Sequence, residues 1–204
     1  EFGPDKNKLW EADVPFGRSS PVIAGDRLFL SATEEGTFVT LALDRKTGKT
    51  IWEVKDKWGA SYASPIVAKL RGVDCAIVAA AGESRPAHGG LLVIDALTGK
   101  VFDRFPWRAN IYESVLASTP LVLGNNRVYL GDCYSKGGVV LEFDQKLKSR
   151  VLWSERWFGM HWMVPLHIDG HLYGFAGRNI PDTQFKCADA RTGKILWEED
   201  MRWQ

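Results

Sequence analysis

The chain is a succession of short apolar runs separated by polar turns. In the first cycle these runs occupy residues 21–23, 27–30, 38–43 and 50–54. Apolar residues alternate with small or polar ones in the third run. β-Branched and aromatic residues are frequent throughout, which is typical of strands bounded by Gly, Asp and Asn turns. No segment has a helical period of useful length. The pattern therefore predicts short antiparallel strands along the whole chain.

One stretch of this pattern, Ala42–Trp52, recurs along the chain. It places an Asp, a Thr-Gly-Lys turn and a Trp at fixed offsets. Cys187–Trp197 repeats it well, whereas Val93–Asp103 and Glu142–Trp153 repeat it with losses. A second marker, a Pro that usually follows Ser or Thr, returns in phase at Pro21, Pro65, Pro120 and Pro165. Two markers cycling together every ~45–50 residues match the period of β-propeller blades.

A four-stranded sheet of this size cannot bury both of its faces, so neighbouring sheets must stack on it. Stacking around an axis gives a propeller, which leaves only short, protected edges. We therefore expect an all-β protein: a β-propeller of four-stranded antiparallel blades, with about four blades present. The expected single propeller region is 1–204, with repeats at approximately 13–54, 55–107, 108–157 and 158–203.

Each member of the repeat has an expected structural role. The Asp should accept backbone N–H groups of its turn, and the Gly should supply a positive φ. The Trp should pack on the next blade and donate its N–H to a backbone carbonyl there. The residues in these roles are Asp44, Gly48, Trp52, Asp95, Gly99, Asp144, Trp153, Asp189, Gly193 and Trp197. Because they recur once per blade, we interpret them as structural rather than catalytic.

Two copies depart from this pattern. The second copy has Asp103 at the Trp position, so we expect Phe102 or Trp107 to fill that seam between blades. The third copy lacks the Thr-Gly step and carries one extra residue before Trp153, so its turn must differ.

The repeat, written Ala-x-Asp-x-x-Thr-Gly-x-x-x-Trp, resembles the tryptophan-docking repeat of the quinoprotein (PQQ-like) β-propeller superfamily. The resemblance covers essentially the whole chain. It is strongest to non-catalytic secreted bacterial members, and more distant to outer-membrane assembly lipoproteins. Propellers of that superfamily have seven or eight blades, which implies that these four form a partial propeller or part of a larger one. Leu9–Glu11 looks like the closing strand of a preceding blade.

Open blade faces would expose apolar surface and invite self-association. Two copies of four blades could then close a ring of eight. The resemblance also implies a periplasmic or secreted protein. No secretory signal is visible, which fits a mature or trimmed chain, or a cytosolic one.

Composition narrows the range of partners. Lys and Arg number 26 against 25 Asp and Glu, for a net charge of +1. This balance gives no electrostatic reason to expect nucleic acid or an anionic membrane surface. No apolar run approaches the ~20 residues that span a bilayer. The three cysteines, Cys75, Cys133 and Cys187, have no metal-ligand spacing, so we predict buried thiols and no metal site; whether any of them pair stays open.

The chain order also predicts where a ligand would bind. In an up-and-down blade the second-to-third loops and the inter-blade links lie at one end, and the other turns lie at the opposite end. The long segments 33–37, 79–90, 131–138 and 177–184 all belong to the first group, so we expect a ligand there. The candidate ligand-binding residues are Arg18, Trp58, Tyr62, Arg85, His88, Tyr134, His161, Trp162 and Arg178; Asp132, Lys136 and Asp182 lie in the same loops.

Sequence signatures of enzymes are missing. The chain has no Gly-x-Ser-x-Gly, His-Glu-x-x-His or phosphate-binding loop. It also lacks the adjacent Cys-Cys pair and any alignable calcium set of the quinoprotein dehydrogenases that it resembles. We therefore expect a non-catalytic binding or scaffolding module without a cofactor, its ligand a protein, small molecule or carbohydrate. The alternative is part of a PQQ-dependent alcohol or sugar dehydrogenase whose catalytic residues, with PQQ and calcium, lie outside this chain.

Overall fold

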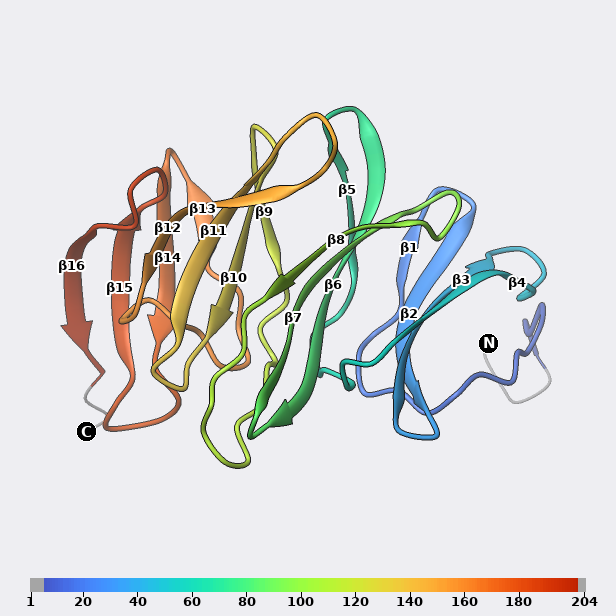
Figure 1. Ribbon diagram of the computed structural model, residues 1–204, viewed down its shortest axis with the longest axis horizontal. Coiled ribbons are helices and arrows are strands. Elements are labelled where there is room, and N and C mark those ends of the chain that lie inside the picture. Colours follow the sequence, from blue (N-terminus) through green and yellow to red (C-terminus); the bar gives the residue numbers. More distant parts are fainter. Residues whose placement is uncertain (1–5, 202–204) are drawn as a thin grey trace.

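The computed structural model describes residues 6–201, and every regular element in this range is a β-strand (Figure 1). Sixteen strands form four sheets of four strands each. Within each sheet the strands lie in chain order, and all neighbours are antiparallel. The all-β class and the four-stranded blades are confirmed. No helix capable of crossing a membrane occurs in the described range.

The first sheet consists of β1 (Val22–Ala24), β2 (Arg27–Glu34), β3 (Thr37–Asp44) and β4 (Thr50–Asp56). The second sheet consists of β5 (Ile66–Leu70), β6 (Val73–Ser84), β7 (Ala87–Asp95) and β8 (Val101–Pro106). The third sheet consists of β9 (Leu121–Gly124), β10 (Arg127–Asp132), β11 (Gly137–Phe143) and β12 (Ser149–Glu155). The fourth sheet consists of β13 (Leu166–Ile168), β14 (His171–Ala176), β15 (Gln184–Asp189) and β16 (Ile195–Asp200).

The sheets follow one another in the order of the predicted repeats, from the N-terminal side on the right of Figure 1 to the C-terminal side on the left. The first sheet runs to Asp56, past the boundary expected at residue 54. The second-to-third connections and the links between sheets lie along the lower edge of Figure 1, and the other turns lie along its upper edge. We call the lower edge the loop end.

Buried apolar side chains fill the seams between neighbouring sheets. Strand β7 shows why two seams can share one strand, because its side chains point alternately to the two faces. Leu91 and Val93 pack toward the third sheet, whereas Leu92 and Ile94 pack toward the first. A third cluster fills the seam between the third and fourth sheets around Tyr129. The faces that point toward a neighbouring sheet are therefore buried between the two sheets.

The turn Asp of each repeat caps its turn as predicted. The Asp44 carboxylate accepts the backbone N–H groups of Lys46 and Thr47 at 3.0 and 2.8 Å, and Asp95, Asp144 and Asp189 do the same in the other sheets. The Gly that ends the turn has φ of 72–77° in the first, second and fourth sheets. The third turn does differ, because Leu147 takes the positive φ of 59° there.

The repeat Trp lies in the seam between sheets. Trp52 donates its indole N–H to the carbonyl of Ala96, just after the next turn Asp, at 3.1 Å. Trp153 does the same to Ala190 at 3.0 Å. A methyl group added at Gly193 would lie 2.5 Å from the Trp153 ring, so only Gly fits beneath it. Trp10 bonds to the Arg45 carbonyl in the same way at 2.9 Å, although residues 9–11, where a closing strand was expected, form no strand.

The seam that lacks a Trp has polar contacts at that position, in addition to its apolar cluster. The Asp103 carboxylate accepts the backbone N–H of Ser149 at 3.0 Å, and the Lys148 ammonium lies 3.6 Å from it. Phe102 and Trp107 both pack, partly buried, against the cluster of this seam. Both residues therefore fill the seam, where one of the two was expected to take the place of the missing Trp.

The two outermost sheet faces differ from each other. Val39, Leu41 and Leu43 of the first sheet are buried together with Ala12, which precedes β1. The outward face of the fourth sheet instead presents an aromatic cluster of Tyr173, Phe175, Phe185 and Trp197.

The loop lengths require one correction. Residues 33–37 and 79–90 are not long loops: β2 and β3 are joined by Glu35 and Gly36, and β6 and β7 pair as far as Ser84 and Ala87. The Ala, Gly and Ser content of residues 79–90 argues against a strand, but pairing with β7 overrides that local preference. The connections at 131–138 and 177–184 do contain irregular loops.

Candidate aromatic binding face at the loop end

The loop end brings six of the nine predicted binding residues into one continuous row. They come from the segment before β1, two links between sheets and two second-to-third loops, and we call them the aromatic row: Arg18, Tyr62, Trp162, His161, Tyr134 and Arg178. The row extends from the link before β1 to the loop after β14, so its members are far apart in sequence.

The first half of the row joins the links before the first, second and fourth sheets. The Arg18 guanidinium donates to the Tyr62 hydroxyl, and its carbon lies 5.1 Å from the ring centre. The Tyr62 ring meets Trp162 edge to face, with centroids 4.9 Å apart. Cation–π and edge-to-face contacts of this geometry are attractive, so these side chains hold one another in place.

The second half of the row centres on a histidine and a tyrosine. The His161 ring lies 5.0 Å from Trp162, and its Nε2 lies 3.1 Å from the Tyr134 hydroxyl. The Arg178 guanidinium lies 5.3 Å from the Tyr134 ring centre. Burial lowers the pKa of His161 and raises the pKa of Tyr134, so both are neutral near pH 7. The charge of the row comes from the arginines at its two ends.

A buried ion pair positions Tyr134 from the other side. The Asp132 carboxylate accepts the backbone N–H of Tyr134 at 3.1 Å and that of Ala109 at 3.0 Å, and it lies 3.8 Å from the Arg108 guanidinium. Arg108 in turn donates to the hydroxyl of Ser114 at 2.6 Å and to its carbonyl. Burial lowers the pKa of Arg108 and raises the pKa of Asp132, which is the desolvation cost of keeping both charges inside.

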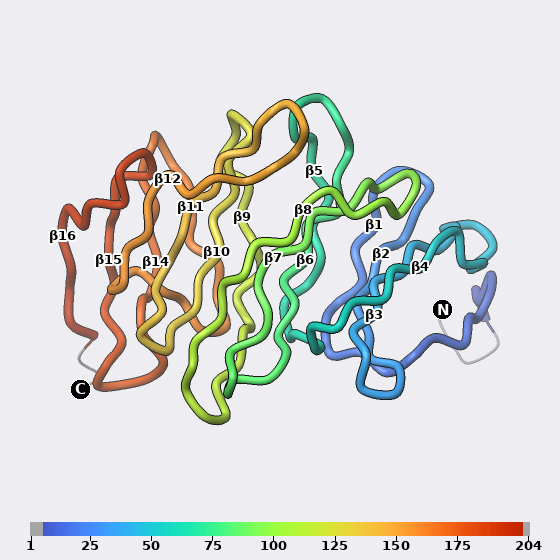
Figure 2. The backbone as a smooth tube through the Cα atoms, in the orientation of Figure 1, coloured from blue at the N-terminus to red at the C-terminus, as the bar shows by residue number. Residues whose placement is uncertain are grey.

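Arg108 was missed by the sequence analysis, although the repeat contains a signal for it. Three links begin with an aromatic residue followed by Gly: Phe16-Gly17, Trp58-Gly59 and Phe158-Gly159. The corresponding step in the remaining link is Trp107-Arg108. This link, 107–120, is also the longest of the three that join one sheet to the next, and it descends to the lower edge of the molecule (Figure 2). It exposes Tyr112, at 68%.

The other three predicted binding residues lie off the row. Trp58 is half-buried and packs against the seam between the first and second sheets. Arg85 and His88 are exposed at the end of the β6–β7 strand pair, off the row, because that segment is a hairpin and not a long loop.

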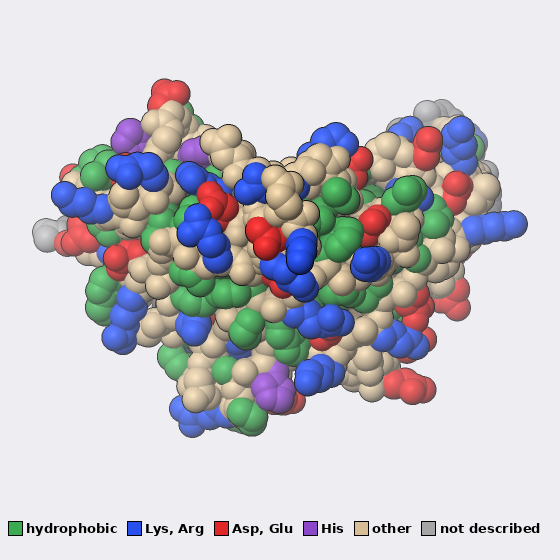
Figure 3. Space-filling view, turned by 45° about the horizontal axis from the view of Figure 1, so that its top comes forward, with side chains coloured by type: hydrophobic (Ala, Val, Ile, Leu, Met, Phe, Trp, Pro, Cys, Tyr) green, Lys and Arg blue, Asp and Glu red, His purple; other side chains and the backbone are tan. Residues whose placement is uncertain are grey.

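Charges are mixed over the molecule. On the face seen in Figure 3, Lys and Arg side chains are interspersed with Asp and Glu, in agreement with the even overall balance. Within residues 6–201 no three His, Cys, Asp or Glu side chains gather closely enough to hold a metal ion. The three cysteines are free thiols, and burial raises the pKa of Cys75 to about 11 and that of Cys133 to about 12. Such thiols are protonated near neutral pH and are poor nucleophiles.

The fold resembles several solved propellers. BamB from Moraxella catarrhalis superposes with a TM-score of 0.64 at 17% identity, covering 95% of this chain and 53% of that chain. A europium-containing methanol dehydrogenase superposes with a TM-score of 0.62 at 13% identity, covering 89% and 41%. The quinohemoprotein alcohol dehydrogenase from Comamonas testosteroni gives 0.53 at 13% identity, covering 93% and 43%. The chain thus spans about half the length of these relatives, and the likeness is one of fold.

A comparison with curated protein sequences finds no match. The family model described as outer membrane protein assembly factor BamB, in contrast, matches residues 3–199, nearly the whole chain. Together with the four-stranded blades and the turn that recurs in each of them, this match shows that the chain belongs to that family of PQQ-like repeat β-propellers.

Proposed function

We propose that this chain is a non-catalytic propeller module that binds a protein partner at its loop end. The observation that carries the proposal is the aromatic row. Arg, Tyr and Trp are the residue types that dominate binding energy at protein interfaces. Because the row's side chains already stack on one another, little conformational entropy is left to lose on binding. The exposed arginines at the two ends favour a partner segment with acidic ends and an apolar centre.

The family supports the same proposal. Its description names an assembly factor rather than a chemical reaction, and the sequence contains no enzyme motif. A periplasmic or secreted location is part of this proposal, and so is the role of the repeat Trp as a docking element that fastens blade to blade.

The alternative function, part of a PQQ-dependent dehydrogenase, is favoured by the two dehydrogenases among the similar folds. The donor set of this chain does not fit that cofactor. Cys75 lies in β6, Cys133 follows β10 and Cys187 lies in β15, so these thiols belong to three different sheets. The alternative therefore requires residues outside these four sheets. Adding PQQ and calcium to the purified chain separates the two functions: a stoichiometric shift of the quinone absorbance would contradict our proposal.

An array of short peptides tests the binding face. We expect the purified chain to retain peptides with acidic ends and an apolar centre, and Trp162→Ala to weaken their binding roughly tenfold or more, as for interface hot spots. Arg85→Ala is the matched control, because Arg85 is an exposed loop-end cation that lies off the row. Equal binding by wild type and Trp162→Ala, or no peptide retained at all, would overturn the proposal.

A further inference from the structure

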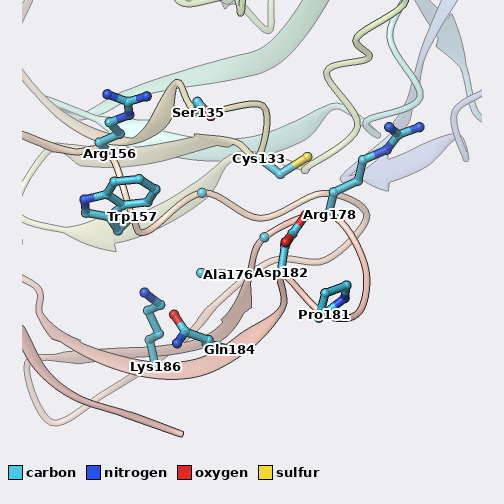
Figure 4. Close-up of a pocket in the computed structure, with 12 residues that line it drawn as sticks. Cys133, Ser135, Arg156, Trp157, Ala176, Arg178, Pro181, Asp182, Gln184 and Lys186 are labelled. Atoms are coloured by element: carbon cyan, nitrogen blue, oxygen red, sulfur yellow. The ribbon is translucent and has the colours of Figure 1, made fainter. Parts of the chain in front are cut away.

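We infer a second binding site, for a small sugar acid, in the hollow between the third and fourth sheets. This hollow has a volume of about 390 Å³, which is in the range of small-molecule sites. Trp157 and Arg156 follow β12 on one side, and Gln184 and Lys186 rise from β15 on the other (Figure 4). The site is separate from the protein-binding role proposed above and does not depend on it.

The repeat itself marks Lys186 as unusual. Three residues before the turn Asp, the first three sheets have Leu41, Leu92 and Leu141, each buried against the seam on the N-terminal side of its sheet. The fourth sheet has Lys186 at this position, and it is also buried, at 5% exposure. Placing an ammonium where an apolar side chain suffices elsewhere costs desolvation energy. A residue that recurs in every blade serves the fold, so a costly departure from the repeat points to a local function.

The Lys186 ammonium is available to a ligand. Figure 4 shows its nitrogen end directed into the hollow, on the side of Trp157. Its acceptor among the described residues is the Glu198 carboxylate at 3.0 Å, whose side chain is 51% exposed. An ammonium has three N–H donors, so one half-exposed carboxylate leaves donor capacity for an anion. A ligand carboxylate in the hollow would form a charge-assisted hydrogen bond shielded from water.

The wall of the hollow opposite Lys186 determines which group the ligand can carry beside its carboxylate. Trp157 is 61% exposed, and the Arg156 guanidinium lies 5.1 Å from its ring centre. An exposed indole offers a flat apolar surface on which the C–H face of a sugar ring can stack. Asp182 and Gln184 also line the hollow and can bind hydroxyl groups. The Arg178 guanidinium points away from Lys186, toward Tyr134. A carboxylate on a sugar-sized ring, as in a hexuronic acid, satisfies both walls together.

A purely structural role makes a different prediction. If Lys186 served only to pair with Glu198, removing that carboxylate would strand a buried cation and create no ligand affinity. If the hollow is an anion site, Glu198 competes with the ligand, so Glu198→Gln should strengthen the binding of a carboxylate. The sign of this change distinguishes the two roles.

Isothermal titration of the full chain with D-glucuronate tests the inference, with D-glucose as the neutral control. We expect saturable binding of glucuronate and none of glucose at about 10 mM. Lys186→Met should weaken glucuronate binding roughly tenfold or more, the worth of a hydrogen bond to a charged group. Trp157→Ala should weaken it as well, whereas Trp162→Ala in the aromatic row should leave it unchanged.

Lys186→Met restores an apolar side chain like that of the other blades, so it should fold, and thermal unfolding checks this. Should it fail to fold, the Glu198→Gln titration decides alone, and a gain in affinity supports the site. The inference would be overturned by no glucuronate binding in the wild type or by equal binding of glucose. Unchanged glucuronate affinity in both Lys186→Met and Glu198→Gln would overturn it as well. Because Trp162→Ala tests the peptide face and Lys186→Met tests the hollow, failure of one proposal leaves the other standing.

Discussion

At the scale of single residues, the repeat Trp differs from blade to blade in its burial and in its contacts with the next sheet. Trp52 is 8% exposed and bonds to the next sheet, whereas Trp197 is 41% exposed and packs on Phe185 within its own sheet. The two positions match in the repeat, so they form a natural pair for measuring what the seam contributes.

We expect Trp52→Ala to lower the free energy of unfolding by about 3–5 kcal/mol, as for other large-to-small core changes. Trp197→Ala should cost clearly less, because its ring is already partly in water. Urea unfolding followed by circular dichroism measures both. Equal losses would show that the seam contact contributes nothing specific.

His161 should make stability depend on pH. Burial lowers its pKa in the folded state, so the unfolded chain binds more protons below its ordinary pKa near 6.5. The free energy of unfolding should therefore fall as the pH drops below about 6.5 toward the folded pKa. Above about pH 6.5, His161 is neutral in both states and should not lower it. Unfolding midpoints at about pH 7.5 and about pH 5.5 should differ more for wild type than for His161→Gln. An identical pH response in the two proteins would exclude this role.

At the scale of elements, the link between the second and third sheets is where the molecule departs most from its own repeat. Arg108 takes the place of the Gly found in the other links. Its guanidinium donates to the Ser114 hydroxyl in the same link and lies 3.8 Å from the Asp132 carboxylate. A loop anchored in this way can hold the exposed Tyr112 in a defined place. This link thus contains a buried charge pair that costs desolvation energy and that anchors the link to the third sheet.

Arg108→Gly, which restores the residue found in the other links, should lower the free energy of unfolding by about 3–5 kcal/mol, because it leaves the Asp132 carboxylate buried without its cation. Amide hydrogen exchange at Ser114 and Val115 should also accelerate, since the anchor of the link is gone. Lys69→Ala is the control: it removes an exposed pair with Asp74, worth at most about 1 kcal/mol. A loss no larger than that of the control would contradict the anchoring role.

At the scale of the whole molecule, the two end faces are unequal. The first sheet buries Val39, Leu41 and Leu43, and the Trp10 indole bonds to the Arg45 carbonyl in its β3–β4 turn. The fourth sheet instead exposes part of its aromatic cluster. Exposed apolar surface of this kind favours association.

We therefore expect concentration-dependent self-association in sedimentation at micromolar concentration. Phe185→Ser and Trp197→Ser should weaken it, because both rings belong to the exposed face. A ring closed by two copies would also have to accommodate Trp10 on the facing turn, so Trp10→Ala should alter the association as well. A strictly monomeric wild-type chain would contradict this expectation.

Much of the fold could be predicted because its determinants are local and repeated. The Asp44 cap, the Gly48 turn and the position of Trp52 each depend on a few neighbouring residues, and four copies make the signal visible. The length of the β6–β7 hairpin could not be predicted, since the Ala- and Gly-rich segment 79–90 becomes a strand only through its pairing partner. Six of the predicted binding residues meet in the aromatic row, whereas Arg85 and His88 lie off it for the same reason. That the row binds a ligand stays a prediction.

The sequence by itself determined the blade: the strand period, the capped turn and the alternation of side chains that buries both faces follow from interactions among near neighbours. Only the tertiary structure decided which loop residues meet. The contacts from Arg18 to Arg178 join five separate segments, and the burial of Arg108 and Lys186 depends on the sheet packed beside each of them. Contacts between segments far apart in the chain leave no local pattern, and they appear only when the blades are stacked.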